Sequence, residues 1–191
     1  MGNVVSFQVS VSDLTPTFGP ALGAQLLDIF IRDPAVGSFS TAAPHPLRNF
    51  TIANDSAWSS RIEIQGFATP VFVDVRGREV GTVDVVADQK TRTIQVNVQK
   101  SDLGQPGRGW VFTVTLAGQD GFSPDQARGF AAAPQPYLFG VCAVDLTAPI
   151  CRLSAATVPK LMDVITPRRV RQADELDPTR GRVSLQGVTA P

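Results

Sequence analysis

The feature that most constrains the fold is an alternation of apolar and polar residues with a period of two. In residues 109–118, GWVFTVTLAG, every second side chain from Trp110 to Leu116 is large and apolar. Residues 4–11, VVSFQVSV, repeat the pattern, which is that of a β-strand with one buried face. Residues 26–33, LLDIFIRD, are apolar on both faces, and this predicts a strand in the middle of a sheet.

Further short strands are predicted between these segments, at residues 61–67, 71–77, 80–88 and 91–100. The chain has 15 Pro and 16 Gly but only three Glu and three Lys, a composition that favours strands and turns over helices. We therefore predict an all-β fold, an antiparallel β-sandwich of two sheets packed face to face. One or two short helices are expected, one at Ser123-Pro124-Asp125-Gln126 and one near residue 160.

The chain is long enough for one large domain, and residues 1–191 are interpreted as a single β-sandwich domain. Residues 33–49 contain three prolines and no sustained period, which predicts a long loop. Residues 166–191 begin with a charged stretch and regain alternation at Val183 and Leu185. This segment is predicted to form either an edge strand or a surface tail.

The overall charge disfavours polyanionic partners. Seventeen basic and seventeen acidic residues cancel, so no summed field attracts nucleic acid or an anionic membrane. No segment approaches the roughly 18 apolar residues that a membrane-spanning helix needs. Residues 1–3 lead directly into the first strand, so no signal peptide is visible in this chain. The two cysteines, Cys142 and Cys151, form either a disulfide or two buried free thiols.

Residues suited to catalysis are scarce. The single histidine, His45, lies between two prolines, and no GxSxG turn presents a serine nucleophile. The glutamates are Glu63, Glu79 and Glu175, and nothing singles out a pair of carboxylates for glycoside cleavage. Spacings typical of zinc sites are absent. Calcium binding through loop oxygens is an open alternative, although the sequence has no EF-hand-type loop. We do not expect an enzyme.

Aromatic rings offer another route to function, because a ring stacks on the apolar face of a sugar while polar neighbours bond its hydroxyls. Trp58 follows a polar loop, where packing in the core is favoured over contact with a ligand. Tyr137 follows two prolines in a loop, which favours an exposed ring. Arg128 is placed either to bond sugar hydroxyls or to pair with a neighbouring aspartate.

The order of these segments resembles that of the C-terminal module of glucodextranase and related secreted amylolytic enzymes, over roughly residues 4–190. The "Q..DI.I" pattern of that family is matched by Gln25, Asp28, Ile29 and Ile31. Its "GW.F.V...GQDG" segment is matched by Gly109, Trp110, Phe112, Val114, Gly118, Gln119, Asp120 and Gly121, and the match runs on to Arg128. Its "FGG" and "D...P" elements are matched in part by Phe139, Gly140, Asp163 and Pro167.

The resemblance implies an immunoglobulin-like or carbohydrate-binding-module-like sandwich that is non-catalytic and belongs to an extracellular or cell-surface enzyme. It implies a polysaccharide or cell-wall glycan and a neighbouring catalytic domain as partners. Asp120, Phe122 and Arg128 would then line a ligand-facing rim, while the GQDG segment also ends a core strand. The chain departs from the family pattern in two places, because it lacks the acidic "GDD.GPG" segment and has a cysteine soon after Gly140.

Two functions follow as hypotheses. The first is a carbohydrate-binding module of an enzyme that acts on α-glucans, with Trp58, Asp120, Phe122, Arg128 and Tyr137 as candidate ligand-binding residues. The alternative is a structural or cell-surface-anchoring domain with no sugar site of its own.

Overall fold

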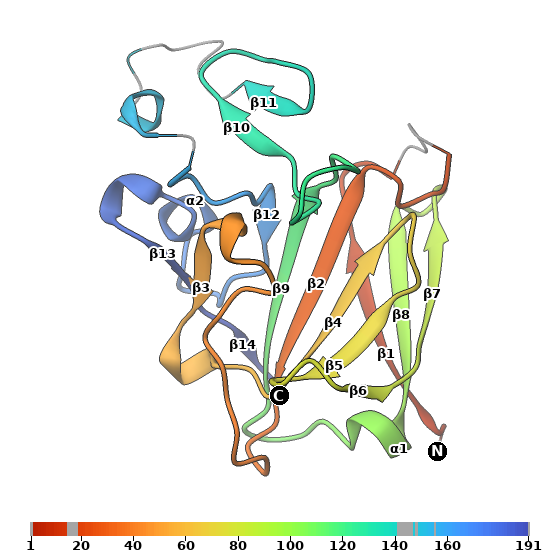
Figure 1. Ribbon diagram of the computed structural model, residues 1–191. Coiled ribbons are helices and arrows are strands. Elements are labelled where there is room, and N and C mark those ends of the chain that lie inside the picture. The colour runs from red at the N-terminus through yellow and green to blue at the C-terminus, as the bar shows by residue number, and fades with distance from the viewer. Residues whose placement is uncertain (1, 15–18, 141–146, 148, 155, 191) are drawn as a thin grey trace.

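A large antiparallel sheet forms the middle layer of the molecule (Figure 1). The computed structural model describes residues 2–14, 19–140, 147, 149–154 and 156–190. In this part of the chain the large sheet has the order β12-β9-β2-β4-β5-β6, with β14 also paired to β9. Its strands are β2 (Gln25–Arg32), β4 (Ser60–Gln65), β5 (Val71–Asp74), β6 (Glu79–Gly81), β9 (Val111–Gly118), β12 (Asp163–Val164) and β14 (Val188–Thr189). The central position predicted for β2 is confirmed, because this strand pairs with both β4 and β9.

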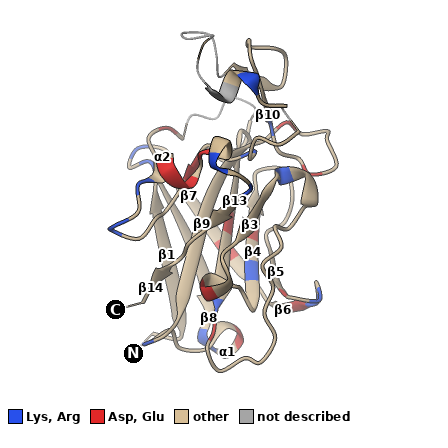
Figure 2. Cartoon of the chain, turned by 90° about the vertical axis from the view of Figure 1, so that its left-hand side faces the viewer, with Lys and Arg blue, Asp and Glu red and all other residues tan. Residues whose placement is uncertain are grey.

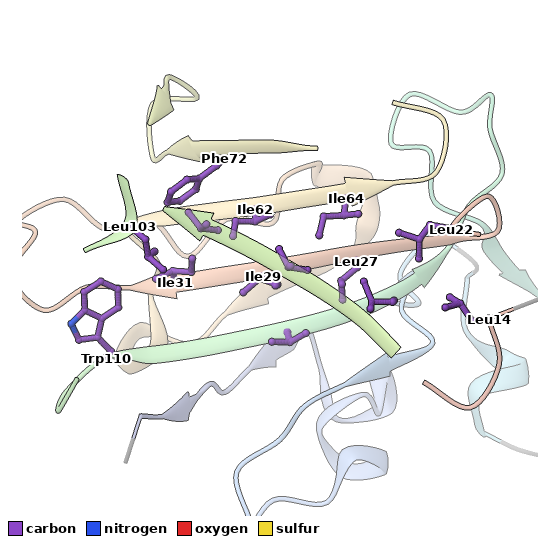
Figure 3. Close-up of a cluster of buried hydrophobic side chains, with 14 residues drawn as sticks. Leu14, Leu22, Leu27, Ile29, Ile31, Ile62, Ile64, Phe72, Leu103 and Trp110 are labelled. Carbon is purple, nitrogen blue, oxygen red and sulfur yellow. The ribbon is translucent and has the colours of Figure 1, made fainter. Parts of the chain in front are cut away.

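A three-stranded sheet packs on one face of the large sheet. It consists of β1 (Val4–Ser10), β8 (Thr93–Gln99) and β7 (Val83–Asp88) in the order β1-β8-β7. Figure 3 shows Ile29 and Ile31 of β2 beside Ile62 and Ile64 of β4 in the core that the two sheets enclose. The facing side chains of β8 are Ile94, Val96 and Val98, all fully buried. The predicted all-β sandwich is therefore confirmed.

The opposite face of the large sheet is also buried. There β3 (Phe50–Ile52) pairs in parallel with β13 (Val183–Leu185), on the left of the large sheet in Figure 1. These strands pack with the second apolar face of β2 in a separate core. Within the segment predicted as an edge strand or tail, Val183 and Leu185 are buried and β14 joins the large sheet.

The described residues include two short α-helices, which confirms the expectation of one or two short helices, but they lie elsewhere than predicted. They are α1 (Lys100–Leu103) and α2 (Gln172–Glu175), and the 3-10 turns are η1 (Pro46–Arg48), η2 (Asn54–Ser56), η3 (Pro149–Arg152) and η4 (Pro178–Arg180). The helix predicted at residues 123–126 is wrong: the Ser123 hydroxyl donates to Asp125 instead of capping a helix, and Gln126 has a φ of 53°. The helix predicted near residue 160 is also wrong, because β12 pairs there with β9.

A small parallel ribbon extends past the end of β9, at the top of Figure 1. It pairs β10 (Gly129–Ala131) with β11 (Leu138–Gly140). Basic and acidic residues are interspersed in the view of Figure 2, in agreement with the balanced charge of the sequence. None of the helices in the described ranges is long and apolar enough to span a membrane.

Candidate functional site

A surface pocket of ≈ 410 Å³ opens where β9 ends. Three stretches of the chain contribute most of its wall: the turn before β2, the turn after β4 and the loop after β9. The lining residues are Gly23, Phe67, Gln119, Asp120, Gly121, Gln126, Arg128 and Tyr137. Three of the residues predicted to bind a ligand, Asp120, Arg128 and Tyr137, thus line one pocket.

The loop of residues 119–128, which we call the pocket loop, folds back along its own strand. The Gln119 backbone N–H donates to the Ala24 carbonyl at 2.9 Å, and the Arg128 N–H donates to the Gly118 carbonyl at 2.7 Å. One carboxylate oxygen of Asp120 accepts the backbone N–H groups of Phe122 and Ser123, both at 3.1 Å. The GQDG segment therefore ends the strand in a turn that the Asp120 side chain stabilises.

Two exposed aromatic rings, Phe67 and Tyr137, line the pocket, and a third, the predicted site residue Phe122, lies against Tyr137 without lining it. Phe67, Phe122 and Tyr137 are 57%, 64% and 51% exposed, whereas most large apolar side chains of the two cores are buried. Phe122 meets Tyr137 edge to face, with 4.7 Å between ring centroids. Phe67 was not predicted from the sequence. Its position in the turn GFATP, directly after an alternating strand, is the signal that could have indicated an exposed ring.

Two buried polar atoms at the pocket have no hydrogen-bond partner. Gln119 is 5% exposed, and its amide nitrogen donates to Gln65 while its Oε1 is unpartnered. The Nε of Arg128 is also buried and unpartnered, and the guanidinium lies 4.9 Å from the centre of the Phe139 ring. Two residues that line the pocket therefore carry a buried acceptor and a buried donor without a partner in the described structure, which is costly unless a ligand or water satisfies them.

The backbone at the pocket is unusual in two ways. Gln126 and Tyr137 have φ values of 53° and 64°, in the left-handed region that non-glycine residues seldom adopt. Such conformations persist where the surrounding structure holds them, and they cluster at functional sites. Gly66 also allows the turn after β4 to contact the turn before β2, since a Cβ there would lie 2.4 Å from the Leu22 carbonyl carbon.

Trp58 is not part of the pocket. It is 2% exposed, its indole N–H donates to the Ala42 carbonyl at 2.8 Å, and its ring contacts Phe30 in the second core. Its inclusion among the candidate ligand-binding residues is therefore corrected. A polar loop precedes Trp58 in the sequence, but a backbone bridge between Ser40 and Trp58 turns the ring inward.

Two carboxylates outside the pocket lie directly opposite each other, Asp28 on β2 and Glu63 on β4. Each is bonded to an arginine, Asp28 to Arg48 and Glu63 to Arg61. The adjoining cavity measures only ≈ 40 Å³, which is room for water and not for a sugar ring. Burial raises the pKa of Asp28; the Arg48 charge opposes this effect and Glu63 adds to it.

Metal and disulfide chemistry add little to the site. Within the described ranges, no group of three or more His, Cys, Asp or Glu could hold a metal ion, and calcium binding stays a prediction. Cys151 lies in η3 and is disulfide-bonded. Cys142, the other half of the predicted bridge, lies outside the described residues.

The fold and the site define a β-sandwich module with a loop-built pocket at the end of a central strand. Such a pocket, with a few polar groups among aromatic rings, is typical of small-molecule sites. A family model described as the C-terminal binding module, SLH-like, of glucodextranase matches residues 1–185, so the chain belongs to this family. The resemblance inferred from the order of the motifs is confirmed. No curated protein is significantly similar to the chain.

Proposed function

We propose that this module binds a glycan in the pocket at the end of β9 and performs no catalysis of its own. Exposed rings of Phe67 and Tyr137 provide apolar surface for a sugar ring. The Arg128 fork and the Gln119 carbonyl supply a donor and an acceptor, and a hydroxyl group can satisfy either.

The observation that carries the proposal is the pair of unpartnered polar atoms in an aromatic-lined pocket. A surface that merely packs against a neighbouring domain does not require an unpaired Gln119 Oε1 and an unpaired Arg128 Nε on residues that line one pocket. Membership of a binding-module family supports the same reading. We further propose that the module acts outside the cell or at its surface, joined to a catalytic domain whose local substrate concentration it raises.

The experiment is affinity electrophoresis in gels that contain dextran, soluble starch or a cell-wall polysaccharide preparation, followed by calorimetry with isomaltoheptaose and maltoheptaose. We expect retardation by at least one of these glycans. Arg128→Ala and Tyr137→Ala should each weaken binding about 5- to 30-fold, the effect of losing about 1–2 kcal/mol from a well-placed contact. Arg108→Ala is the matched control, because Arg108 is exposed just before the opposite end of β9.

The outcomes separate the hypotheses. Retardation of the parent protein that the two pocket variants lose and the control keeps supports a glycan site in the pocket. Migration unchanged by every glycan would refute the proposal and leave the anchoring alternative. Binding that survives both pocket substitutions would place the glycan site elsewhere on the module.

A further inference from the structure

A largely buried polar network joins four parts of the chain: the large sheet, η1, the pocket loop and the segment before β12. Nη1 of Arg48 lies 2.5 Å from the Asp28 carboxylate, and both side chains are 3% exposed. The Thr115 hydroxyl donates to the same carboxylate at 3.5 Å. Lys160 Nζ contacts the Asp125 carboxylate at 2.9 Å, and Asp125 is 1% exposed. The large sheet is thereby connected to the pocket loop through charged side chains.

The Arg48 side chain is bonded to the main chain of the pocket loop. Its Nε and Nη2 both donate to the Asp125 carbonyl oxygen, at 3.2 and 3.1 Å. The Arg48 carbonyl in turn accepts the backbone N–H of Lys160 at 2.9 Å. Asp125 is therefore fixed at its carbonyl by one cation and at its carboxylate by another. Burial alone would raise the pKa of Asp125, but the hydrogen bonds from Lys160 and Ser123 hold it below the ordinary value.

The residue that follows is part of the pocket. Gln126 lines it, has the left-handed φ of 53°, and accepts the backbone N–H of Asp120 at 3.0 Å. A shift of the Asp125 peptide would therefore move both Gln126 and the turn that presents Asp120. In the described structure, Arg48 is the residue that donates two hydrogen bonds to the Asp125 carbonyl.

We propose that the Asp28–Arg48 ion pair positions the pocket loop, so that Arg48 is a positioning residue for ligand binding although it does not line the pocket. This inference rests on the proposed glycan site. A purely stabilising role is a weaker explanation, because a buried ion pair can often be replaced by apolar side chains without loss of stability. Apolar side chains, however, could not hold the Asp125 carbonyl.

The test uses two variants of the whole module. Arg48→Lys keeps the charge beside Asp28 but lacks the fork that reaches the Asp125 carbonyl. The double variant Asp28→Leu/Arg48→Met replaces the pair with apolar groups and remains informative if the single variant folds poorly. Val96→Ala is the control, since it weakens the core between the two sheets, away from the pocket loop.

The first readout is amide hydrogen exchange across residues 119–128, which needs no ligand. We expect exchange in the pocket loop to accelerate about tenfold or more in Arg48→Lys, while the strands of the three-stranded sheet keep their protection. Val96→Ala should show the opposite distribution. The second readout is affinity for isomaltoheptaose or maltoheptaose, whichever the parent protein binds. This affinity is expected to fall about 2- to 30-fold in both Arg48 variants and to stay unchanged in the control.

Pocket-loop exchange that matches the parent protein in both Arg48 variants would overturn the inference, whatever the glycan results show. Faster exchange with unchanged affinity for the bound heptasaccharide would also overturn it, because a displaced loop would then be irrelevant to binding. If the parent protein binds none of the glycans, the proposed function fails separately.

Discussion

Trp58→Phe tests whether Trp58, a candidate ligand-binding residue of the sequence, stabilises the core or contacts a ligand. The substitution removes the indole N–H that bonds the Ala42 carbonyl and part of a ring that is 2% exposed. The lost hydrogen bond costs about 1 kcal/mol, because Ala42 is exposed and water can take the place of the indole. The missing ring atoms, equivalent to one or two buried methylene groups, add about 1 kcal/mol.

The free energy of unfolding should therefore fall by about 2 kcal/mol. In a domain of this length such a change lowers the melting temperature by roughly 4–8 °C. Urea denaturation measures it directly: the midpoint should fall while the slope of free energy against urea concentration stays the same. Glycan retardation of the folded variant, measured well below its melting temperature, should equal that of the parent protein.

Tyr137→Ala is the natural counterpart, because Tyr137 is half exposed at the pocket. It should keep the urea midpoint and lose glycan retardation, the reverse of the result expected for Trp58→Phe. An unchanged midpoint together with lost retardation in Trp58→Phe would contradict the reasoning, since it would mean that the ring of Trp58 meets the ligand.

Two further predictions concern local packing and charge. Gly66→Ala should lower the free energy of unfolding by about 1–3 kcal/mol, because the new Cβ would lie 2.4–2.5 Å from backbone atoms of Leu22 and Gly23. Thermal denaturation measures this loss. An unchanged melting temperature would contradict the close approach of the two turns. Glu175 has a raised pKa, caused by burial and only partly offset by the backbone N–H of Gln186. A carboxyl group whose pKa is raised by folding contributes to the free energy of unfolding. This contribution is fully present below the unfolded pKa of 4.5 and is lost as the pH rises through the folded pKa. The stability of Glu175→Gln relative to the parent should therefore increase between about pH 4 and neutrality. Urea midpoints over this range measure the difference, and a constant difference would refute the assignment.

The sandwich could be predicted from the sequence because local periodicity reports burial. The two apolar faces of residues 26–33 correspond to the two separate cores on either side of β2. Short strands could not be predicted, because local periodicity is absent from them. A strand of two or three residues, such as β12 or β3, is too short to show a period, and its pairing is decided by contacts with distant segments.

The pocket was predicted in part. Asp120 and Arg128 could be selected because they follow a recognisable strand in the family pattern, and Tyr137 because it follows two prolines in a loop. Phe67 could not be placed beside them, since its approach depends on backbone contact between two turns about 40 residues apart, through Gly66. Trp58 was included because it follows a polar loop, although core packing was favoured for it, and the sequence does not reveal which way the ring turns.

Asp28 shows how a sequence motif and a functional site can be related without contact. In the sequence it is a polar residue within an apolar strand, which a local pattern cannot distinguish from an outward-facing side chain. In the structure Asp28 is 2% exposed and is bonded to Nη1 of Arg48, while Nη2 of the same guanidinium donates to the loop whose residues line the pocket. Burying a carboxylate is unfavourable unless a specific partner compensates, so the position of Arg48 is constrained by Asp28. The position of the Asp125 carbonyl is constrained in turn, because the Arg48 guanidinium is planar and its donors point in fixed directions. A substitution at Asp28 should therefore alter the pocket without changing the identity of any residue that lines it.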